Sequence, residues 1–218
     1  MRIEIICSDD RHPVRPFLDR WHSRHSSTHD ISIVNAPAQL AGGHILFAIS
    51  CSDILRPAHR GLFRHSLVVH ASDLPRRRGW SPHVWAILEG EPRITVSLLT
   101  ADDPVDSGLI FHQEQFDVSP ADTLEEINAK LFEAELALMD WAVANIDTAV
   151  PREQFGDPTY CRRRTPDDSR LDPDQSIAAQ FDILRLADDR RFPAFFDLHG
   201  HRYALALTKM ETSEEEDR

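Results

Sequence analysis

Residues 66–108 read SLVVHASDLPRRRGWSPHVWAILEGEPRITVSLLTADDPVDSG. Their first apolar run predicts a strand that ends at His70, and the residues after the following loop predict a short helix over 84–88 and a second strand over 94–99. An acidic turn over 102–108 comes next and contains Asp106. Ligands of open α/β sheets bind outside the carboxyl ends of the strands, so we expect His70 and Asp106 to face one crevice.

Several motifs in this stretch occur in the order that is typical of one enzyme family. They are His70-Ala71-Ser72-Asp73-Leu74-Pro75, Arg78-Gly79, Ser81-Pro82, Trp85-Ala86-Ile87 and Asp102-Asp103-Pro104-Val105-Asp106-Ser107-Gly108. With them, residues 44–148 resemble the folate-dependent formyltransferases, which transfer a formyl group from 10-formyltetrahydrofolate to an amine. The separation of His70 from Asp106 is also like that of the family.

The resemblance implies that His70 and Asp106 are catalytic. The family has an Asn two residues before this His, and this sequence has Val68 there. Alternation along a strand puts Ser66 on the same face as His70, which makes Ser66 a candidate replacement donor. Ser50 and Ser72 are further candidates.

The resemblance also implies a site for the folate donor. The residues expected to contact it are in the acidic turn and just after His70: Asp102, Asp103, Val105 and Ser72. In the family this turn contributes backbone hydrogen bonds to the pterin ring. The alternative for Ser72 is a simple turn residue.

Two basic clusters, residues 76–78 and 162–164, stand out in an acidic chain. Arginine pairs bidentately with phosphate and carboxylate groups, and Trp80 can stack on a substrate ring. The substrate-binding candidates are therefore Arg77, Trp80, Arg163 and Arg164. Solvated surface charges and a packing role for Trp80 remain the alternatives.

The rest of the chain alternates strand-like and helix-like segments. Strands are expected over 2–8, 31–34, 45–50 and 109–116, and helices over 13–25 and from 122, where Asp122 and Glu125 fit a capping box. This order predicts an α/β fold with a Rossmann-like, mostly parallel sheet flanked by helices, in a catalytic domain over 1–150.

Residues 151–218 are expected to form a small C-terminal extension. Its parts are a polar loop, a helix over 176–187, a β-hairpin over 195–207 and an acidic tail over 214–217. This region looks, more loosely, like the corresponding part of sugar N-formyltransferases.

Composition limits the classes of partner. The 218 residues are 41% apolar and 28% charged, without a membrane-length apolar run or a signal-peptide layout, so we expect a cytoplasmic protein without membrane contact. A net charge of −12 opposes nucleic-acid binding, and tRNA is disfavoured as a substrate. The three cysteines and the histidines show no metal-ligand spacing, so no metal is expected. A homodimer is left open.

The sequence is therefore interpreted as an N-formyltransferase that uses 10-formyltetrahydrofolate. The expected acceptor is a primary amine on a nucleotide-linked amino sugar for surface polysaccharide synthesis. The alternatives are an amino-acid or carrier-bound amine, and a non-catalytic folate-binding or ligand-binding protein on the same scaffold.

Overall fold

The computed structural model describes residues 1–210, which form two compact units. The first unit contains residues 1–118 and 128–163, and the second contains residues 119–127 and the chain from Arg164 onward. Strands of the first unit are β1 (Arg2–Ile6), β2 (Asp30–Val34), β3 (Gly43–Ala48), β4 (Phe63–His70), β5 (Arg78–Gly79), β6 (Arg93–Thr100), β7 (Ile110–Asp117) and β8 (Tyr160–Cys161). Its helices are α1 (Arg15–His25), η1 (Pro37–Gln39), α2 (Pro57–Arg60), α3 (Pro82–Leu88) and most of α4 (Leu124–Asn145).

A six-stranded sheet in the order β2-β1-β3-β4-β6-β7 organises the first unit. The first four of these strands are mutually parallel, and β6 and β7 are antiparallel additions at one edge. The expected Rossmann-like, mostly parallel α/β sheet is confirmed. Because β6 pairs antiparallel with β4, with Ser97 opposite His70, the carboxyl ends of these two strands do not meet. The expected approach of His70 and Asp106 therefore cannot come from strand ends that share one edge of the sheet.

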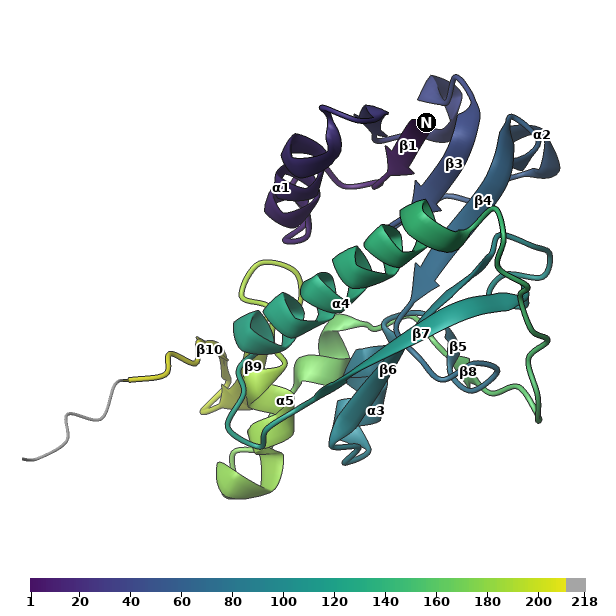
Figure 1. Ribbon diagram of the computed structural model, residues 1–218. Coiled ribbons are helices and arrows are strands. Elements are labelled where there is room, and N and C mark those ends of the chain that lie inside the picture. The colour runs from purple at the N-terminus through teal and green to yellow at the C-terminus, as the bar shows by residue number, and fades with distance from the viewer. Residues whose placement is uncertain (211–218) are drawn as a thin grey trace, which may run out of the picture. The chain divides into compact units, whose positions relative to one another are not determined.

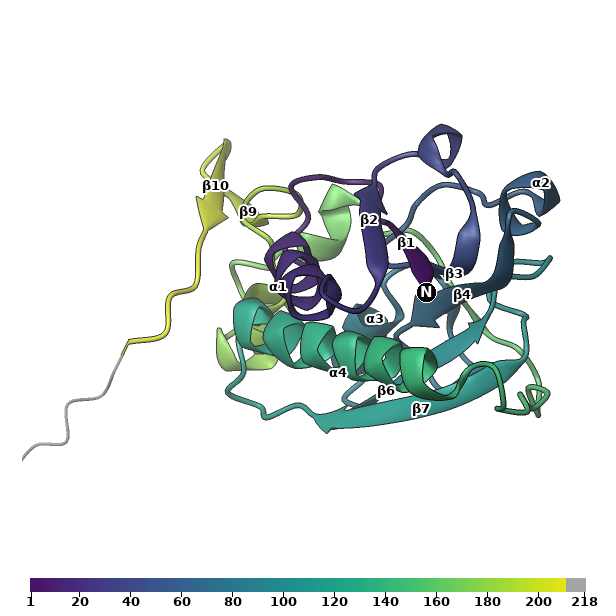
Figure 2. The same cartoon turned by 45° about the horizontal axis from the view of Figure 1, so that its top comes forward.

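Two helices cover one face of this sheet. Leu18 and Trp21 of α1 and Leu131 and Met139 of α4 share one core cluster with inward-facing sheet residues such as Phe47. Figures 1 and 2 show α1 and α4 on the same side of the sheet. Burial of this large apolar surface is what fixes the strand order and the strand ends that carry the site.

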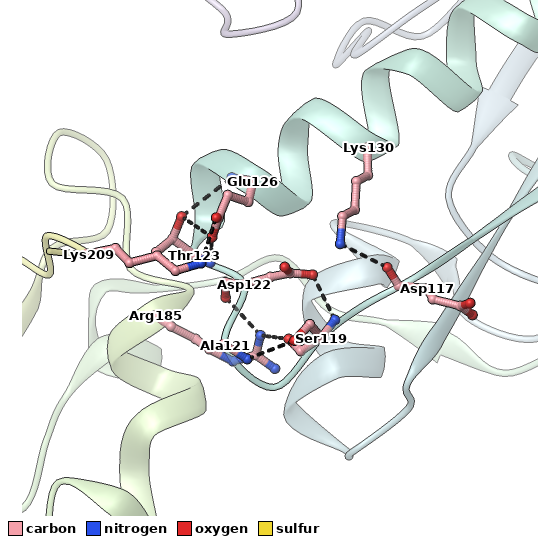
Figure 3. A network of polar contacts seen from close by, with 9 residues as sticks. All are labelled: Asp117, Ser119, Ala121, Asp122, Thr123, Glu126, Lys130, Arg185 and Lys209. Carbon is pink, nitrogen blue, oxygen red and sulfur yellow. Dashed lines mark hydrogen bonds and ion pairs between the residues drawn. The ribbon is translucent and has the colours of Figure 1, made fainter. Parts of the chain in front are cut away.

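The second unit begins with the turn before α4. The expected capping box lies one residue further along, because Thr123 and Glu126 exchange hydrogen bonds while Asp122 accepts from the backbone N–H of Ser119 (Figure 3). Arg185 donates to the carbonyl oxygens of Ser119 and Asp122 at 3.0 and 2.9 Å. These bonds pair carbonyl oxygens of the turn that precedes helix α4 and so hold α5 (Phe181–Arg185) to that turn.

The remaining elements of the second unit follow the expected order. They are η2 (Pro166–Ser169), η3 (Ala178–Gln180), α5 (Phe181–Arg185), β9 (Ala194–Leu198) and β10 (His201–Leu205). β9 and β10 form an antiparallel hairpin, as predicted. The acidic tail expected over 214–217 lies outside the described residues.

The boundary between the two units lies after residue 163, whereas the sequence analysis placed it after residue 150. The first unit continues to residue 163 because β8 pairs with β5 of the loop after His70 (Figure 1). Within residues 1–210, no helix combines the length and the apolar character needed to span a membrane.

Candidate functional site

His70 and Asp106 form a buried pair, although the sequence argument for their meeting used the wrong strand direction. His70 is the last residue of β4, and Asp106 is in the loop that returns from β6. The distance from His70 Nδ1 to Asp106 Oδ1 is 3.5 Å, and each residue is 7% exposed. The loop after β6 therefore folds back along the sheet to bring the carboxylate to the histidine.

Backbone groups fix both partners. Asp106 Oδ2 accepts a hydrogen bond of 2.8 Å from the backbone N–H of Gly79, and His70 Nε2 lies 2.9 Å from the carbonyl oxygen of Arg77. A carbonyl oxygen can only accept, so the Nε2 contact requires a proton on Nε2, while Nδ1 faces the carboxylate of Asp106. The arrangement is an oriented proton donor next to a carboxylate.

Two motif positions, Gly79 and Gly108, require glycine for steric reasons. Gly79 has φ +99°, and a Cβ there would lie 2.6 Å from the carbonyl oxygen of Cys161. A Cβ on Gly108 would lie 1.9 Å from the carbonyl oxygen of Thr100, where the loop closes through hydrogen bonds between Thr100 and Leu109. Neither position accommodates a side chain, so the loops that carry the Gly79 N–H and Asp106 require glycine.

Gln154 supports the Asp106 loop and was missed by the sequence reasoning. Its side-chain amide donates to the carbonyl oxygens of Asp106 and Gly108 at 2.8 and 2.9 Å. Its oxygen accepts from Arg78 at 2.6 Å. The residue is in a polar segment 48 positions after Asp106, and no local sequence signal indicates such a contact.

The structure places Ser66 away from His70. The Ser66 hydroxyl donates to the carbonyl oxygen of Arg60 at 3.0 Å. Four strand residues separate Ser66 from His70, or about 13 Å at ~3.3 Å per residue. The two residues are therefore not brought together, and Ser66 instead lines a cleft of about 330 Å³ with Arg60 and Asp102.

Val68 has an apolar environment at the position of the family Asn. It packs partly buried against Leu74, Leu99 and Ile110. Ser72, two residues after His70, is buried, and its hydroxyl has no hydrogen-bond partner within residues 1–210. Among the serine candidates, Ser72 is thus the one with an unused donor close to His70 in the chain.

The predicted folate-contacting residues of the acidic turn have different environments. Asp102 accepts from the Thr100 hydroxyl at 2.5 Å, and Asp103 pairs with Arg60. Val105 is 53% exposed. The two carboxylates thus stabilise the turn internally, and the apolar side chain of Val105 faces solvent.

Arg77 and Arg164 are already occupied by the protein's own groups. Arg77 pairs with Glu89 at 2.5 Å and Glu91 at 2.7 Å. Arg164 is buried in the second unit, donates to Ser169 at 3.1 Å, and has a pKa lowered by desolvation. This structure does not support a substrate-binding role for either of them.

Trp80 and Arg163, both predicted to bind the substrate, contact each other. The Arg163 guanidinium carbon lies 4.9 Å from the centre of the Trp80 ring, and Trp80 is 42% exposed. The Trp80 backbone N–H bonds the carbonyl oxygen of Cys161, next to the β5–β8 pair. An exposed aromatic ring with an arginine on its face can take part in recognition of a ring or an anion.

Comparisons with known proteins identify the family. A family model described as formyl transferase matches residues 12–143. The methionyl-tRNA formyltransferase of Rickettsia massiliae is 36% identical over 106 residues, which is 48% of this chain but only 35% of that relative.

Solved structures with a similar fold cover nearly the whole chain. A methionyl-tRNA formyltransferase from Clostridium thermocellum has a TM-score of 0.82 at 23% identity, covering 97% of this chain and 94% of that one. A sugar N-formyltransferase from a Shewanella species has a TM-score of 0.73 at 14% identity, covering 98% and 99%. On the match of the family model to more than half of its residues, the chain belongs to the formyl transferase family.

Proposed function

We propose that this protein transfers a formyl group from 10-formyltetrahydrofolate to a primary amine on a nucleotide-linked amino sugar. The observation that carries the proposal is the buried His70–Asp106 pair, held by the backbone N–H of Gly79. The folate donor follows from membership of the formyl transferase family.

In formyl transfer an unprotonated amine attacks the formyl carbon, and a donor stabilises the negative charge that develops on the formyl oxygen. The bond from the formyl carbon to the folate nitrogen then breaks, and the proton lost by the attacking amine passes to that nitrogen, which leaves tetrahydrofolate. His70 is suited to the role of the donor because Asp106 orients the ring from the Nδ1 side and the imidazole can donate a proton from Nε2. The Nε2–H would leave the carbonyl oxygen of Arg77 and donate to the reacting oxygen. A positioned donor of this kind contributes about 3–4 kcal/mol to the transition state.

The loss of the family Asn leaves one donor to be replaced. Val68 supplies no polar group, whereas the unpartnered Ser72 hydroxyl can donate. We assign Ser72 the role of second donor, in place of Ser66. Asp102, Asp103 and Val105 keep the proposed role of forming the turn that contacts the donor, through backbone groups and the exposed Val105 side chain.

Trp80 and Arg163 are proposed to bind the acceptor. The exposed ring can stack on a base or sugar, and the guanidinium on it can pair with a phosphate of a nucleotide. The net charge of −12 favours a small phosphorylated acceptor over a polynucleotide. Methionyl-tRNA is the second candidate, because the relative that is 36% identical is named for that substrate.

The test is an assay of tetrahydrofolate release from 10-formyltetrahydrofolate with separate acceptors. The panel contains nucleotide-linked amino sugars, methionyl-tRNA, free amino acids and a carrier-bound aminoacyl group. We expect turnover with one amino sugar, loss of most of it in His70→Ala, and no change in the matched control His201→Ala, an exposed histidine of the second unit.

Two results would revise the proposal in different ways. Turnover only with methionyl-tRNA or another amine would replace the acceptor and keep the chemistry. Folate binding without formylation of any amine, unaffected by His70→Ala, would indicate a binding protein on this scaffold.

A further inference from the structure

The first unit contains a cluster of His44, His65 and Asp147 that the formyl transfer chemistry does not use. His44 is at the start of β3, His65 is near the start of β4, and Asp147 follows the end of α4. His65 precedes His70 by five strand residues, or about 16 Å at ~3.3 Å per residue. The cluster is therefore separate from the proposed catalytic pair.

The three side chains converge on one small volume. The two oxygens of Asp147 lie 3.0 Å from His44 Nε2 and 3.3 Å from His65 Nε2, and all three candidate ligand atoms lie within 4.8 Å of one another. Ligands at ~2.0–2.1 Å from a tetrahedral zinc ion are about 3.3 Å apart. The two histidine-to-carboxylate separations, each to a different oxygen of Asp147, are close to that spacing.

The environment of the ligands also suits a metal. Both histidine side chains are about four-fifths buried, at 21% and 20% exposure, while Asp147 is 43% exposed. Burial holds the two rings in place, and the more exposed carboxylate leaves room for a water molecule as a fourth ligand.

We propose that His44, His65 and Asp147 bind a divalent transition-metal ion, with Zn²⁺ as the representative. Two imidazoles and one carboxylate select zinc and its neighbours over Mg²⁺ and Ca²⁺, which prefer oxygen ligands. The ion would connect the beginnings of β3 and β4 to the segment just after α4, which the three side chains already bring together. Its role would be structural.

Arg64 provides an internal competitor. Its guanidinium lies 3.2 Å from Asp147 Oδ1, the same oxygen that faces His65. A bound cation would have to displace this arginine or share the carboxylate with it. Removing the Arg64 charge should therefore strengthen metal binding, a gain that a misfolded variant would not produce.

The experiment is isothermal titration calorimetry of the full chain with Zn²⁺ at pH 7.5, supported by thermal unfolding with and without the metal. We expect one Zn²⁺ per chain and a melting temperature that rises with the metal. His44→Ala and Asp147→Asn should weaken binding at least tenfold, and Arg64→Met should tighten it several-fold. The matched control is His25→Gln, which removes another histidine–carboxylate contact, 2.9 Å from Asp140.

Melting temperatures in EDTA establish that the variants are folded. The proposal is overturned if the wild-type chain does not bind Zn²⁺ at 100 µM, or if His44→Ala and Asp147→Asn bind it as tightly as the wild type. Equal affinity for Mg²⁺ would also contradict the assignment, because magnesium does not favour imidazole ligands.

Discussion

Glu135 provides a quantitative test of the core between the sheet and α4. This residue of α4 is fully buried, and its Oε2 has no hydrogen-bond partner within the described residues. Burial raises the pKa of Glu135 from 4.5 to about 8. The folded protein therefore retains a proton that the unfolded chain has already released between these two values.

The sign of the effect follows from proton linkage. Between pH 4.5 and about 8 the folded state binds one proton more than the unfolded state at this residue, so stability falls as the pH rises. Each pH unit contributes 1.36 kcal/mol, so the free energy of unfolding decreases by about 3 kcal/mol from pH 4.5 to pH 7 because of Glu135 alone. The full stabilisation is present below pH 4.5.

The perturbation is Glu135→Gln, which keeps the shape of the side chain and removes the titration. We expect urea unfolding curves of this variant and the wild type to diverge as the pH is raised from 5 to 8, with the variant more stable by about 3 kcal/mol at pH 7. The control Glu133→Gln changes an exposed carboxylate on the same helix and should leave the pH dependence unchanged. A wild-type stability with the same pH slope as Glu135→Gln would refute the reasoning.

Three further substitutions test the site. Gly108→Ala should destabilise the protein by at least about 2 kcal/mol and displace the Asp106 loop, because the added Cβ meets the carbonyl oxygen of Thr100. Chemical denaturation checks this against Gly61→Ala, where the nearest atom to an added Cβ is the carbonyl oxygen of Pro57 at 3.2 Å. Val68→Asn should raise the formylation rate about tenfold or more by restoring a donor, at a stability cost of about 1–3 kcal/mol. Steady-state kinetics measures this with Val68→Leu as the control, and a wild-type rate in both variants would contradict the prediction. Trp80→Ala should raise KM for the acceptor and leave folate affinity unchanged. Weaker folate binding by this variant in an equilibrium titration would contradict the assignment of Trp80 to the acceptor site.

The sequence predicted the strands and the motif residues well because their signals are local. Continuous apolar runs identified β4 and β6, and the motif around His70 and Asp106 identified the pair itself. The direction of β6 was not predictable in the same way, because an apolar run has no orientation and both pairings bury the same side chains. His70 and Asp106 meet because the loop after β6 folds back toward the end of β4, and local sequence patterns do not predict the path of such a loop.

Side-chain partners that are distant in sequence account for most of the other differences. The sequence predicted that Arg77 binds an anionic substrate group, but in the structure its guanidinium forms ion pairs with Glu89 and Glu91. Gln154, which fixes the Asp106 loop, and the His44–His65–Asp147 cluster both depend on three-dimensional proximity between separate elements. The capping residue of α4 was one position off because Asp122 and Thr123 are both good N-cap residues, and the structure uses Thr123.

The most direct test of the central claim is the formylation rate of Asp106→Asn relative to the wild type, measured as tetrahydrofolate release at saturating donor. An amide at this position can still accept from Gly79, but it removes the negative charge that lies beside His70 Nδ1. We predict a fall in kcat of about 10²–10⁴ with the fold and donor binding intact. A variant that formylates its acceptor at the wild-type rate would contradict the assignment of His70 and Asp106 as the catalytic pair.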